Sequence, residues 1–326
     1  MRILIIRTDR IGDMILTLPM ATAIKHADPS HTVIMLARKY TEPLVKLCPD
    51  VDEIAIFDEK SSAFELAKQL KSLKADAVII PSPKRKLAMG AMLSGIPIRI
   101  GTGYRWYSFC FNKKIYEHRK TAERNEAEYN LRMLAPLGID ADLSELPSLQ
   151  KNLLPANPIS EKEYIVFHVP TGGSAPAWGA DHWVDLAKKM QAKYEYPIIL
   201  TGSSQEREFL LIMAERMKHE GVSVHIHPEG SLLELAAVLL NAKLVIAGST
   251  GPGHVAAALS APTIGLFPLR RVLSKERWGF RGKQTVNLSP EQSLQPQCPE
   301  CTNCECIDSI SSEAVMATAR NLLHTQ

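Results

Sequence analysis

The chain has 326 residues, of which 45% are hydrophobic and 22% are charged, and its formal net charge is +3. This length predicts two domains of about 150 residues each, and the composition is ordinary for a globular protein. The charge is too small to indicate nucleic-acid binding, and no apolar run approaches the ~20 residues that span a bilayer. Because no signal-peptide pattern precedes the first strand, we expect a cytoplasmic protein that meets anionic substrates or an anionic membrane surface.

Short apolar runs alternate with amphipathic stretches along the first half of the chain. The amphipathic stretches, such as 41–47 and 62–73, carry apolar residues at helical spacing. The apolar runs predict five strands, over 2–6, 32–37, 53–57, 76–80 and 96–100. This alternation predicts βαβ units and a parallel sheet that is covered on both faces.

A proline-rich stretch without periodicity, 137–160, interrupts this pattern. It predicts a boundary between a domain over 1–150 and a domain over 151–326. After it the alternation resumes, with strands expected over 164–169, 196–202, 222–227, 243–248 and 262–267. The last helix, expected over 311–325, is a candidate to pack back on the first domain.

The first strand runs directly into the segment IIRTDRIGDMILTLP, residues 5–19. Ligands of doubly wound sheets bind beyond the carboxyl ends of the strands, so this loop is a candidate site. Asp13 fits either a helix cap or a general base, and Arg7 and Arg10 beside it suit an anionic substrate. Pro19 either kinks the first helix or begins its main segment.

A second basic loop, PSPKRK, follows the strand over 76–80. Lys84, Arg85 and Lys86 fit either a solvated surface or an anion-binding role on the same edge of the sheet. Arg99, Arg105 and the run from Asn112 to Lys114 would extend this basic surface.

Two loops of the expected second domain combine glycines with hydroxyls. The loop after 164–169 carries Thr171, Gly172, Gly173 and Ser174, which fit either a tight turn or close approach to an anion. The loop after 243–248 carries Ser249, Thr250, Gly251 and His254 at the start of a helix. This second pattern favours a phosphate site at the positive end of the helix, although a histidine there also suits a structural role.

A third loop, TGSSQERE, places Ser203 and Glu206 at another helix start, where they suit a cap or a ribose contact. Three such loops on neighbouring strand ends predict a nucleotide on the second domain. None of them is a G-x-G-x-x-G fingerprint or a P-loop, which disfavours dinucleotide redox chemistry and ATP hydrolysis.

Several of these motifs, taken in order, resemble glycosyltransferase family 9, the ADP-heptose:lipopolysaccharide heptosyltransferases. The resemblance rests on IIRTDRIGDMILTLP, RIGTGYR, HVPTGGSAPAW, TGSSQERE and GSTGPGHVAAALSAPTIGLF. It implies an α/β GT-B fold, in which two Rossmann-like, doubly wound parallel-sheet domains face each other across a cleft. It further implies an inverting, metal-independent transfer of heptose from ADP-heptose to the lipopolysaccharide inner core, without a cofactor.

The resemblance also implies roles for individual residues. Asp13 would deprotonate the acceptor hydroxyl, and the basic residues of the first domain would face the Kdo carboxylates and phosphates of the acceptor. Glu206 or its neighbours would contact the ribose, and the backbone near Gly230 would meet the adenine. The ADP diphosphate and sugar would be held by Thr171, Thr250, Gly251 and His254. The expected partners are an ADP-sugar, the anionic acceptor and the cytoplasmic face of the inner membrane, and not nucleic acid.

The sequence departs from the family at two positions. Pro176 stands where many members carry a lysine two residues before the tryptophan, and Ser249 stands where many carry aspartate. A missing cation would remove stabilisation of the leaving diphosphate. A cation among Arg270, Arg271 and Lys275 replaces it, or activity is weak, or the donor differs. A transferase with another donor or acceptor, and a catalytically impaired partner protein that binds sugar nucleotides, are the alternatives.

Four cysteines crowd into CPECTNCEC, at Cys298, Cys301, Cys304 and Cys306. This spacing is tight for one tetrahedral zinc ion and lacks a second C-x-x-C pair, so surface thiols are favoured over a metal site. The D-x-D string at 140–142 is expected to form a solvated turn. No residue is therefore assigned as a metal ligand.

Overall fold

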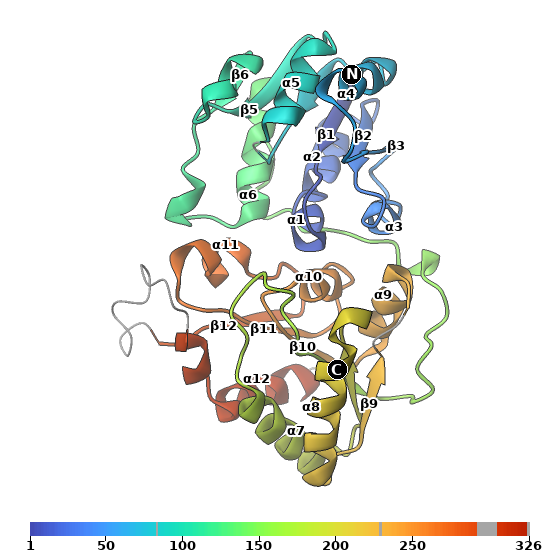
Figure 1. Ribbon diagram of the computed structural model, residues 1–326, viewed down its shortest axis with the longest axis vertical. Coiled ribbons are helices and arrows are strands. Elements are labelled where there is room, and N and C mark those ends of the chain that lie inside the picture. The colour runs from blue at the N-terminus through green and yellow to red at the C-terminus, as the bar shows by residue number, and fades with distance from the viewer. Residues whose placement is uncertain (83, 228–229, 292–304, 325–326) are drawn as a thin grey trace. The chain divides into compact units, whose positions relative to one another are not determined.

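The computed structural model describes residues 1–82, 84–227, 230–291 and 305–324, and the chain forms two compact units (Figure 1). The first unit contains Met1–Arg119 and Glu126–Gln150, and the second contains Lys120–Asn125 and Lys151–Gln326. Of the cysteine cluster, Cys298, Cys301 and Cys304 lie outside the described residues. Cys306 is buried as a free thiol.

The first unit is built on a six-stranded parallel sheet in the order β3-β2-β1-β4-β5-β6. Its strands are β1 (Arg2–Ile6), β2 (Thr32–Ala37), β3 (Glu53–Ile56), β4 (Ala77–Ile79), β5 (Ile98–Thr102) and β6 (Lys113–Ile115). The central strand β1 is an unbroken apolar run that is buried apart from its first residue. Such a run is expected of a parallel strand covered on both faces.

Helices cover both faces of this sheet. On one face, α4 (Ala63–Ser72), α5 (Arg85–Leu93) and the 3₁₀ helix η1 (Trp106–Cys110) pack on Leu4 and Ile6 of β1 and their neighbours. The other face holds α2 (Pro19–Ala27), which packs on β2 and on α6 (Glu126–Leu131). The other helices of this unit are α1 (Ile11–Ile15), α3 (Glu42–Val45) and η3 (Arg132–Leu137), and η2 (Arg119–Thr121) begins at the last residue before the chain passes to the second unit. Pro19 stands at the first turn of α2, where its fixed φ favours a helix start.

The second unit repeats the design with a six-stranded parallel sheet in the order β12-β11-β10-β7-β8-β9. Its strands are β7 (Ile165–His168), β8 (Ile198–Thr201), β9 (Val224–His227), β10 (Leu244–Gly248), β11 (Thr263–Leu266) and β12 (Thr285–Leu288). Its helices are η4 (Lys151–Leu153), α7 (Ala180–Tyr194), η5 (Ser204–Glu206), α8 (Arg207–His219), α9 (Leu232–Asn241), α10 (Gly251–Ala258), η6 (Arg271–Leu273), α11 (Lys275–Trp278), η9 (Glu305–Ser309) and α12 (Ser312–His324).

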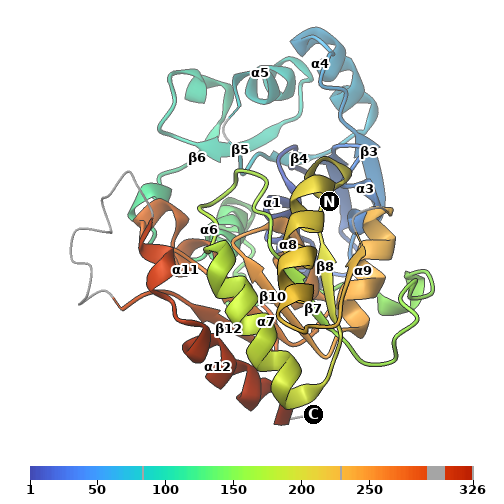
Figure 2. The same cartoon turned by 60° about the horizontal axis from the view of Figure 1, so that its bottom comes forward.

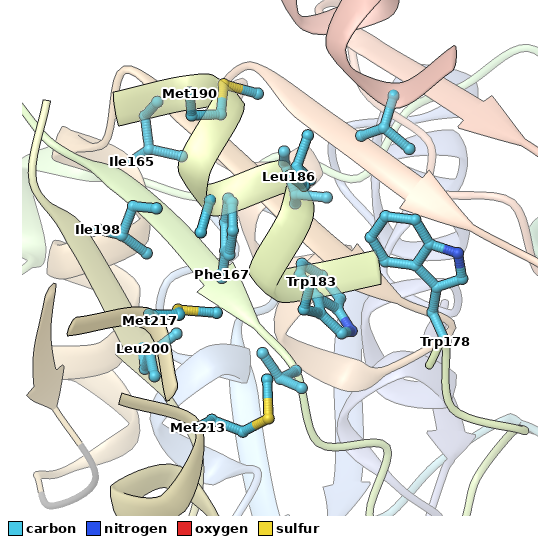
Figure 3. Packing of buried hydrophobic residues seen from close by; sticks show 14 of the residues in the cluster. Ile165, Phe167, Trp178, Trp183, Leu186, Met190, Ile198, Leu200, Met213 and Met217 are labelled. Carbon is cyan, nitrogen blue, oxygen red and sulfur yellow. The ribbon is translucent and has the colours of Figure 1, made fainter. Parts of the chain in front are cut away.

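One face of the second sheet carries the larger apolar core, where α7, α8 and α12 lie together (Figures 1 and 2). Figure 3 shows Phe167 of β7 directed toward Trp183 of α7; the ring centroids are 5.1 Å apart. Trp178 packs edge-on against Trp183 at 5.1 Å. The last helix, α12, thus packs on α7 within its own unit.

Each sheet has one strand that the sequence pattern does not predict, and each is an edge strand. β6 has the sequence KKI and is mostly exposed, and β12 has the sequence TVNL and is only partly buried. An edge strand needs no apolar run, because one side and often one face meet water. In the described ranges, no helix has the length and hydropathy needed to cross a bilayer.

We expect Trp183→Ala to lower the free energy of unfolding by about 3–5 kcal/mol, because it opens a cavity in the core of the second unit. Urea denaturation followed by circular dichroism measures this loss. Trp183→Phe should cost less, since the buried indole N–H finds no partner among the described residues and its removal breaks no hydrogen bond. The exposed Phe209→Ala is the control, and an equal loss in it would contradict the prediction.

Candidate functional site

A buried guanidinium lies just beyond the carboxyl end of β1. Arg7 follows β1 directly, and its side chain is 4% exposed. Its Nε lies 3.2 Å from Asp9 Oδ2, its Nη1 lies 3.6 Å from Glu126 Oε1, and its Nη2 donates to Asp13 Oδ1. One buried cation therefore compensates carboxylates from the β1–α1 loop, from α1 and from α6.

The ionisation of this cluster follows from the same contacts. Burial alone would lower the pKa of Arg7, but Asp13, Glu126 and Asp9 outweigh it and raise that pKa. Burial alone would likewise raise the pKa of Asp9. The Arg7 guanidinium and hydrogen bonds from Lys84 and Ser82 instead hold that pKa below its ordinary value. The pair of Arg7 and Asp9 is therefore fully charged at neutral pH.

Asp13 caps the start of α1, and its carboxylate remains partly accessible. It stands in the first turn of α1, and its Oδ2 accepts from the Arg10 backbone N–H at 3.3 Å, which caps the helix. The side chain still exposes 19% of its surface. Asp13 is thus a carboxylate with a fixed orientation and an accessible edge, which is the geometry that a general base needs.

Glu126 belongs to this cluster, although no motif pointed to it. Its carboxylate is almost fully buried and contacts both Arg7 and Arg119. Asn130, one turn further along the same part of the chain, accepts from Arg119 at 2.9 Å and donates to the Leu16 carbonyl at 3.0 Å. Glu126 is far from Arg7 in sequence, so the two side chains meet only because the chain folds.

The basic residues of the predicted acceptor surface have different environments. Lys84 Nζ lies 2.5 Å from Asp9 Oδ1 and donates to the Thr8 carbonyl at 3.2 Å. Lys86 donates to the Glu59 carbonyl at 2.8 Å and lies over the Phe57 ring. Arg10 and Arg85 are exposed.

In the second unit, the loops after β7 and β10 are joined through one hydroxyl. Ser174 Oγ donates to the Thr171 carbonyl at 2.6 Å and lies 3.0 Å from the Ser249 carbonyl. Gly172 and Gly173 have φ of +54° and +69°, and a Cβ on either would meet nothing within 4 Å. The left-handed backbone explains why both residues are glycines. The space above this loop is open.

The loop after β10 leads into α10 without a side-chain cap. Thr250 is the N-cap residue, but its hydroxyl donates to the Gly248 carbonyl at 3.2 Å. The first N–H groups of this eight-residue helix are therefore not satisfied by Thr250, and N–H groups at a helix start are suited to an anion. Gly253 is required by packing, since a Cβ there would come within 2.1 Å of the Phe280 ring.

His254 is a buried, neutral imidazole on the same helix. Burial lowers its pKa to about 3, and its ring packs edge-on against Phe280 at 4.8 Å. Its Nδ1 finds no hydrogen-bond partner among the described residues. A neutral imidazole carries one N–H donor and one acceptor nitrogen, so His254 can donate one hydrogen bond to a ligand.

The loops after β8 and β9 hold the other predicted donor residues. Glu206 Oε2 accepts from the backbone N–H and the hydroxyl of Ser203, both at 2.8 Å, which closes a capping box. Gly230 has φ of +153°, and a Cβ there would lie 3.1 Å from Glu234 and 3.3 Å from His227. Two histidines at the ends of strands were not singled out by the sequence analysis. Burial lowers the pKa of His227 at the end of β9, and His168 at the end of β7 lies 2.9 Å from the Thr201 hydroxyl.

The two departures from the family pattern lie on these loops. Trp178 is buried, and its indole N–H donates to the Ile310 carbonyl at 2.9 Å, so the tryptophan is part of the core. Pro176 is partly exposed on the β7–α7 loop, and Ser249 supplies the carbonyl near Ser174. Arg270 and Lys275 follow β11, the strand that pairs with β10.

The D-x-D string forms a local turn. The Asp142 carboxylate accepts from the Ser144 backbone N–H at 2.8 Å and from its hydroxyl at 2.7 Å. Among the residues that the structure describes, no group of three or more histidine, cysteine, aspartate or glutamate side chains is arranged to hold a metal ion.

Known proteins resemble this chain over most of its length. The profile of glycosyltransferase family 9 (heptosyltransferase) matches residues 63–306. A Haemophilus influenzae protein, named as a glycosyltransferase of unproven activity, is 29% identical over 299 residues, covering 85% of each chain. Lipopolysaccharide heptosyltransferase 3 of Escherichia coli is 24% identical, over 78% of this chain and 80% of its own.

The solved structure of the Escherichia coli ADP-heptose lipopolysaccharide heptosyltransferase II matches with a TM-score of 0.79 and 20% identity, over 100% of this chain and 99% of its own. Together with the two doubly wound sheets, this likeness confirms the GT-B fold that the sequence predicted. Because the family profile spans well over half of its length, the chain belongs to glycosyltransferase family 9, the heptosyltransferase family.

Proposed function

We propose that this family 9 glycosyltransferase is an inverting, metal-independent heptosyltransferase that moves heptose from ADP-heptose to the lipopolysaccharide inner core, onto a Kdo or heptose acceptor. The observation that carries the proposal is Asp13, a carboxylate oriented by the buried Arg7 and still partly exposed. Relatives named as lipopolysaccharide heptosyltransferases, and a solved ADP-heptose enzyme of the same fold, support the choice of donor and acceptor.

In the proposed step, the Asp13 carboxylate accepts the proton of the acceptor hydroxyl. The hydroxyl oxygen forms a bond to the anomeric carbon of the heptose, on the side opposite to the diphosphate. The bond between that carbon and the ADP oxygen breaks, and ADP leaves with the electron pair. One bond forms and one breaks with inversion at the anomeric carbon, so no covalent enzyme intermediate is required.

The donor is proposed to bind at the carboxyl ends of β7 and β10. The uncapped N–H groups of α10, at Thr250 and Gly251, suit the diphosphate, and the open space above Gly172 and Gly173 suits the sugar. The neutral His254 adds one donor. Additional contacts to the donor are proposed for Thr171, Ser203, Glu206, Gly230 and Ser249.

A cation other than the family lysine is needed to stabilise the departing diphosphate. We propose Arg270, Arg271 or Lys275, because β11 pairs with β10 in parallel, so all three follow a strand end next to Thr250. If none of them serves, the alternatives are a different nucleotide-sugar donor, a different glycan acceptor, or a catalytically impaired protein that binds sugar nucleotides. Pro176 and Ser249 are the observations that favour these alternatives.

On the acceptor side, four basic residues that are exposed or partly exposed suit the anionic acceptor. Arg10, Lys84, Arg85 and Lys86 are proposed to meet the carboxylates and phosphates of the acceptor. Arg7 is already engaged by three carboxylates, so we give it the role of a positioning residue that fixes Asp13.

Calorimetric titration with ADP, UDP and GDP, followed by nucleotide release with a heptose-deficient core acceptor, tests the whole proposal. Preference for UDP or GDP would overturn the donor, and binding without turnover would overturn the enzyme.

We expect Asp13→Asn to lower the rate of ADP release by a factor of about 10²–10⁴, because the amide cannot accept the proton. The ADP dissociation constant should stay within about twofold, since the donor loops lie on the other unit. Asp140→Asn, an exposed aspartate in a loop, is the matched control. A large loss of ADP affinity in Asp13→Asn would show that this residue binds donor and is not the base.

We expect Arg7→Met to lower the free energy of unfolding by about 3–5 kcal/mol, because it leaves buried carboxylates without their cation. Adding Glu126→Leu should recover part of this loss, since it removes one of the stranded charges. Urea denaturation of both variants measures the effect, with the exposed Arg85→Met as control. The assignment is wrong if Arg7→Met is as stable as Arg85→Met.

We expect the contribution of His254 to ADP binding to be independent of pH between about 6 and 8, far above the histidine pKa of about 3. Calorimetry of wild type and His254→Gln should give a constant ratio of affinities over this range. The pH dependence of stability due to His254 is opposite to that of a histidine paired with a carboxylate. In the unfolded chain this residue takes up a proton below its ordinary pKa of about 6.5. In the folded chain it stays neutral down to a pH of about 3. Wild type should therefore lose stability relative to His254→Gln as the pH falls from about 6.5 toward 3. A ratio that changes tenfold near pH 6.5 would mean that a charged imidazole binds the phosphate.

A further inference from the structure

Exposed aromatic side chains gather on one segment of the first unit. Seven aromatic residues of the described chain are classed as exposed, and four of them lie within residues 104–116. Trp106, Phe109 and Tyr116 expose 71%, 60% and 62% of their surface, and Tyr104 exposes 44%. Large apolar groups scattered singly are ordinary on a protein surface, but a contiguous group of this kind marks an interaction site.

The local geometry explains why these rings point outward together. The 3₁₀ helix η1 has three residues per turn, so Trp106 and Phe109 share one side, and their ring centroids are 6.4 Å apart. Tyr107 and Cys110 share another side and are buried in the core with α5. The inward residues thus anchor η1, and the outward aromatic pair is held rigidly on the surface.

The aromatic surface continues onto the edge of the sheet. Tyr104 packs edge-on against Tyr116 at 5.5 Å, and its hydroxyl lies 2.7 Å from the His118 ring. Tyr116 follows β6, the edge strand beside β5 (Figure 1). Its ring occupies the space where a Cβ of residue 103 would stand, which accounts for Gly103. We call Tyr104, Trp106, Phe109 and Tyr116, with the cations Arg105, Lys113 and Lys114, the aromatic–basic surface.

The stretch that carries these rings is basic up to Tyr116, and Glu117, which follows it, pairs with Arg132. Residues 77–116 contain no aspartate or glutamate. The same stretch contains seven cations, namely Lys84, Arg85, Lys86, Arg99, Arg105, Lys113 and Lys114. Arg105, Lys113 and Lys114 are exposed beside the aromatic rings. Lysines on an edge strand also prevent pairing with other strands, but that role explains neither Trp106 nor Phe109.

We propose that the aromatic–basic surface docks the protein on a bilayer that carries anionic phospholipid head groups. Tryptophan and tyrosine favour the boundary between head groups and acyl chains, and clustered lysine and arginine are attracted to anionic lipids. Binding at a membrane surface grows with the buried apolar area and with the attraction to anionic lipids, and this surface supplies both. The inference does not rest on the proposed donor or acceptor, because a bilayer without either is its ligand.

The fluorescence of Trp106 provides a probe for binding at this surface. Of the four tryptophans, Trp178 and Trp183 are buried and Trp278 is partly buried, which leaves Trp106 as the most exposed. The full-length protein should co-sediment with vesicles of phosphatidylethanolamine and phosphatidylglycerol, and much less with phosphatidylcholine vesicles. Brominated acyl chains should quench its fluorescence, and Trp106→Ser should abolish this quenching. Binding should weaken at about 0.5 M salt, where the Debye length is only a few ångströms.

Two sets of variants separate the apolar and the electrostatic parts. Trp106→Ser with Phe109→Ser should remove vesicle binding, whereas Phe64→Ser, an equally exposed aromatic on α4, should not. Lys113→Gln with Lys114→Gln should lower the partition coefficient roughly 25-fold, at about fivefold for each lysine near the head groups. Lys71→Gln with Lys74→Gln is the matched control. Unchanged circular dichroism and ADP titration show that each variant is folded.

Three results would overturn the proposal. The first is equal binding to phosphatidylcholine and phosphatidylglycerol vesicles, or no binding to either. The second is a dimer in light scattering that Trp106→Ser dissociates, which would make this surface an interface between two copies of the chain. The third is vesicle binding that survives both sets of substitutions while turnover on a delipidated acceptor falls, which would assign the aromatic rings to the acceptor sugar.

Discussion

The first unit depends on the burial of one positive charge at the end of its central strand. Taking a guanidinium out of water costs several kcal/mol unless carboxylates surround it, and Arg7 has three within ion-pair distance. Those carboxylates come from the β1–α1 loop, from α1 and from α6, so the charge is compensated only when all three have packed. The same condition fixes the orientation of Asp13. A candidate catalytic group is thus held by an interaction that the fold itself requires.

The strands that carry the loops could be predicted because burial on both faces leaves a clear pattern. β1 and β2 have the predicted limits, and the other apolar strands differ by only a few residues at their ends. The edge strands β6 and β12 could not be predicted, since Lys113, Lys114 and Asn287 interrupt any apolar run. The helix start at Ser203 was also predicted, and Ser203 forms a capping box with Glu206 three residues later.

The partners of the site residues were harder to predict than the residues themselves. Asp13 and His254 stand in recognisable motifs at helix starts, but Glu126 reaches Arg7 only through the packing of α6. Likewise, Gly253 lies in the predicted phosphate loop, but the structure requires a glycine there because the Phe280 ring packs against it. Such contacts join residues that are far apart in the chain, and local sequence patterns do not predict them. The burial that makes His254 neutral is of the same kind.

The short segment Lys120–Asn125 belongs to the second unit, although the residues on either side of it belong to the first. Within the second unit, the Asn125 side-chain amide donates to the Gly279 carbonyl at 3.0 Å. Neither unit is therefore a continuous stretch of chain, and the backbone crosses between them three times. A gene fragment that starts at Lys151 would encode a second unit lacking one of its own pieces. A chimera that takes its second unit from a relative must therefore take residues 120–125 from that relative as well.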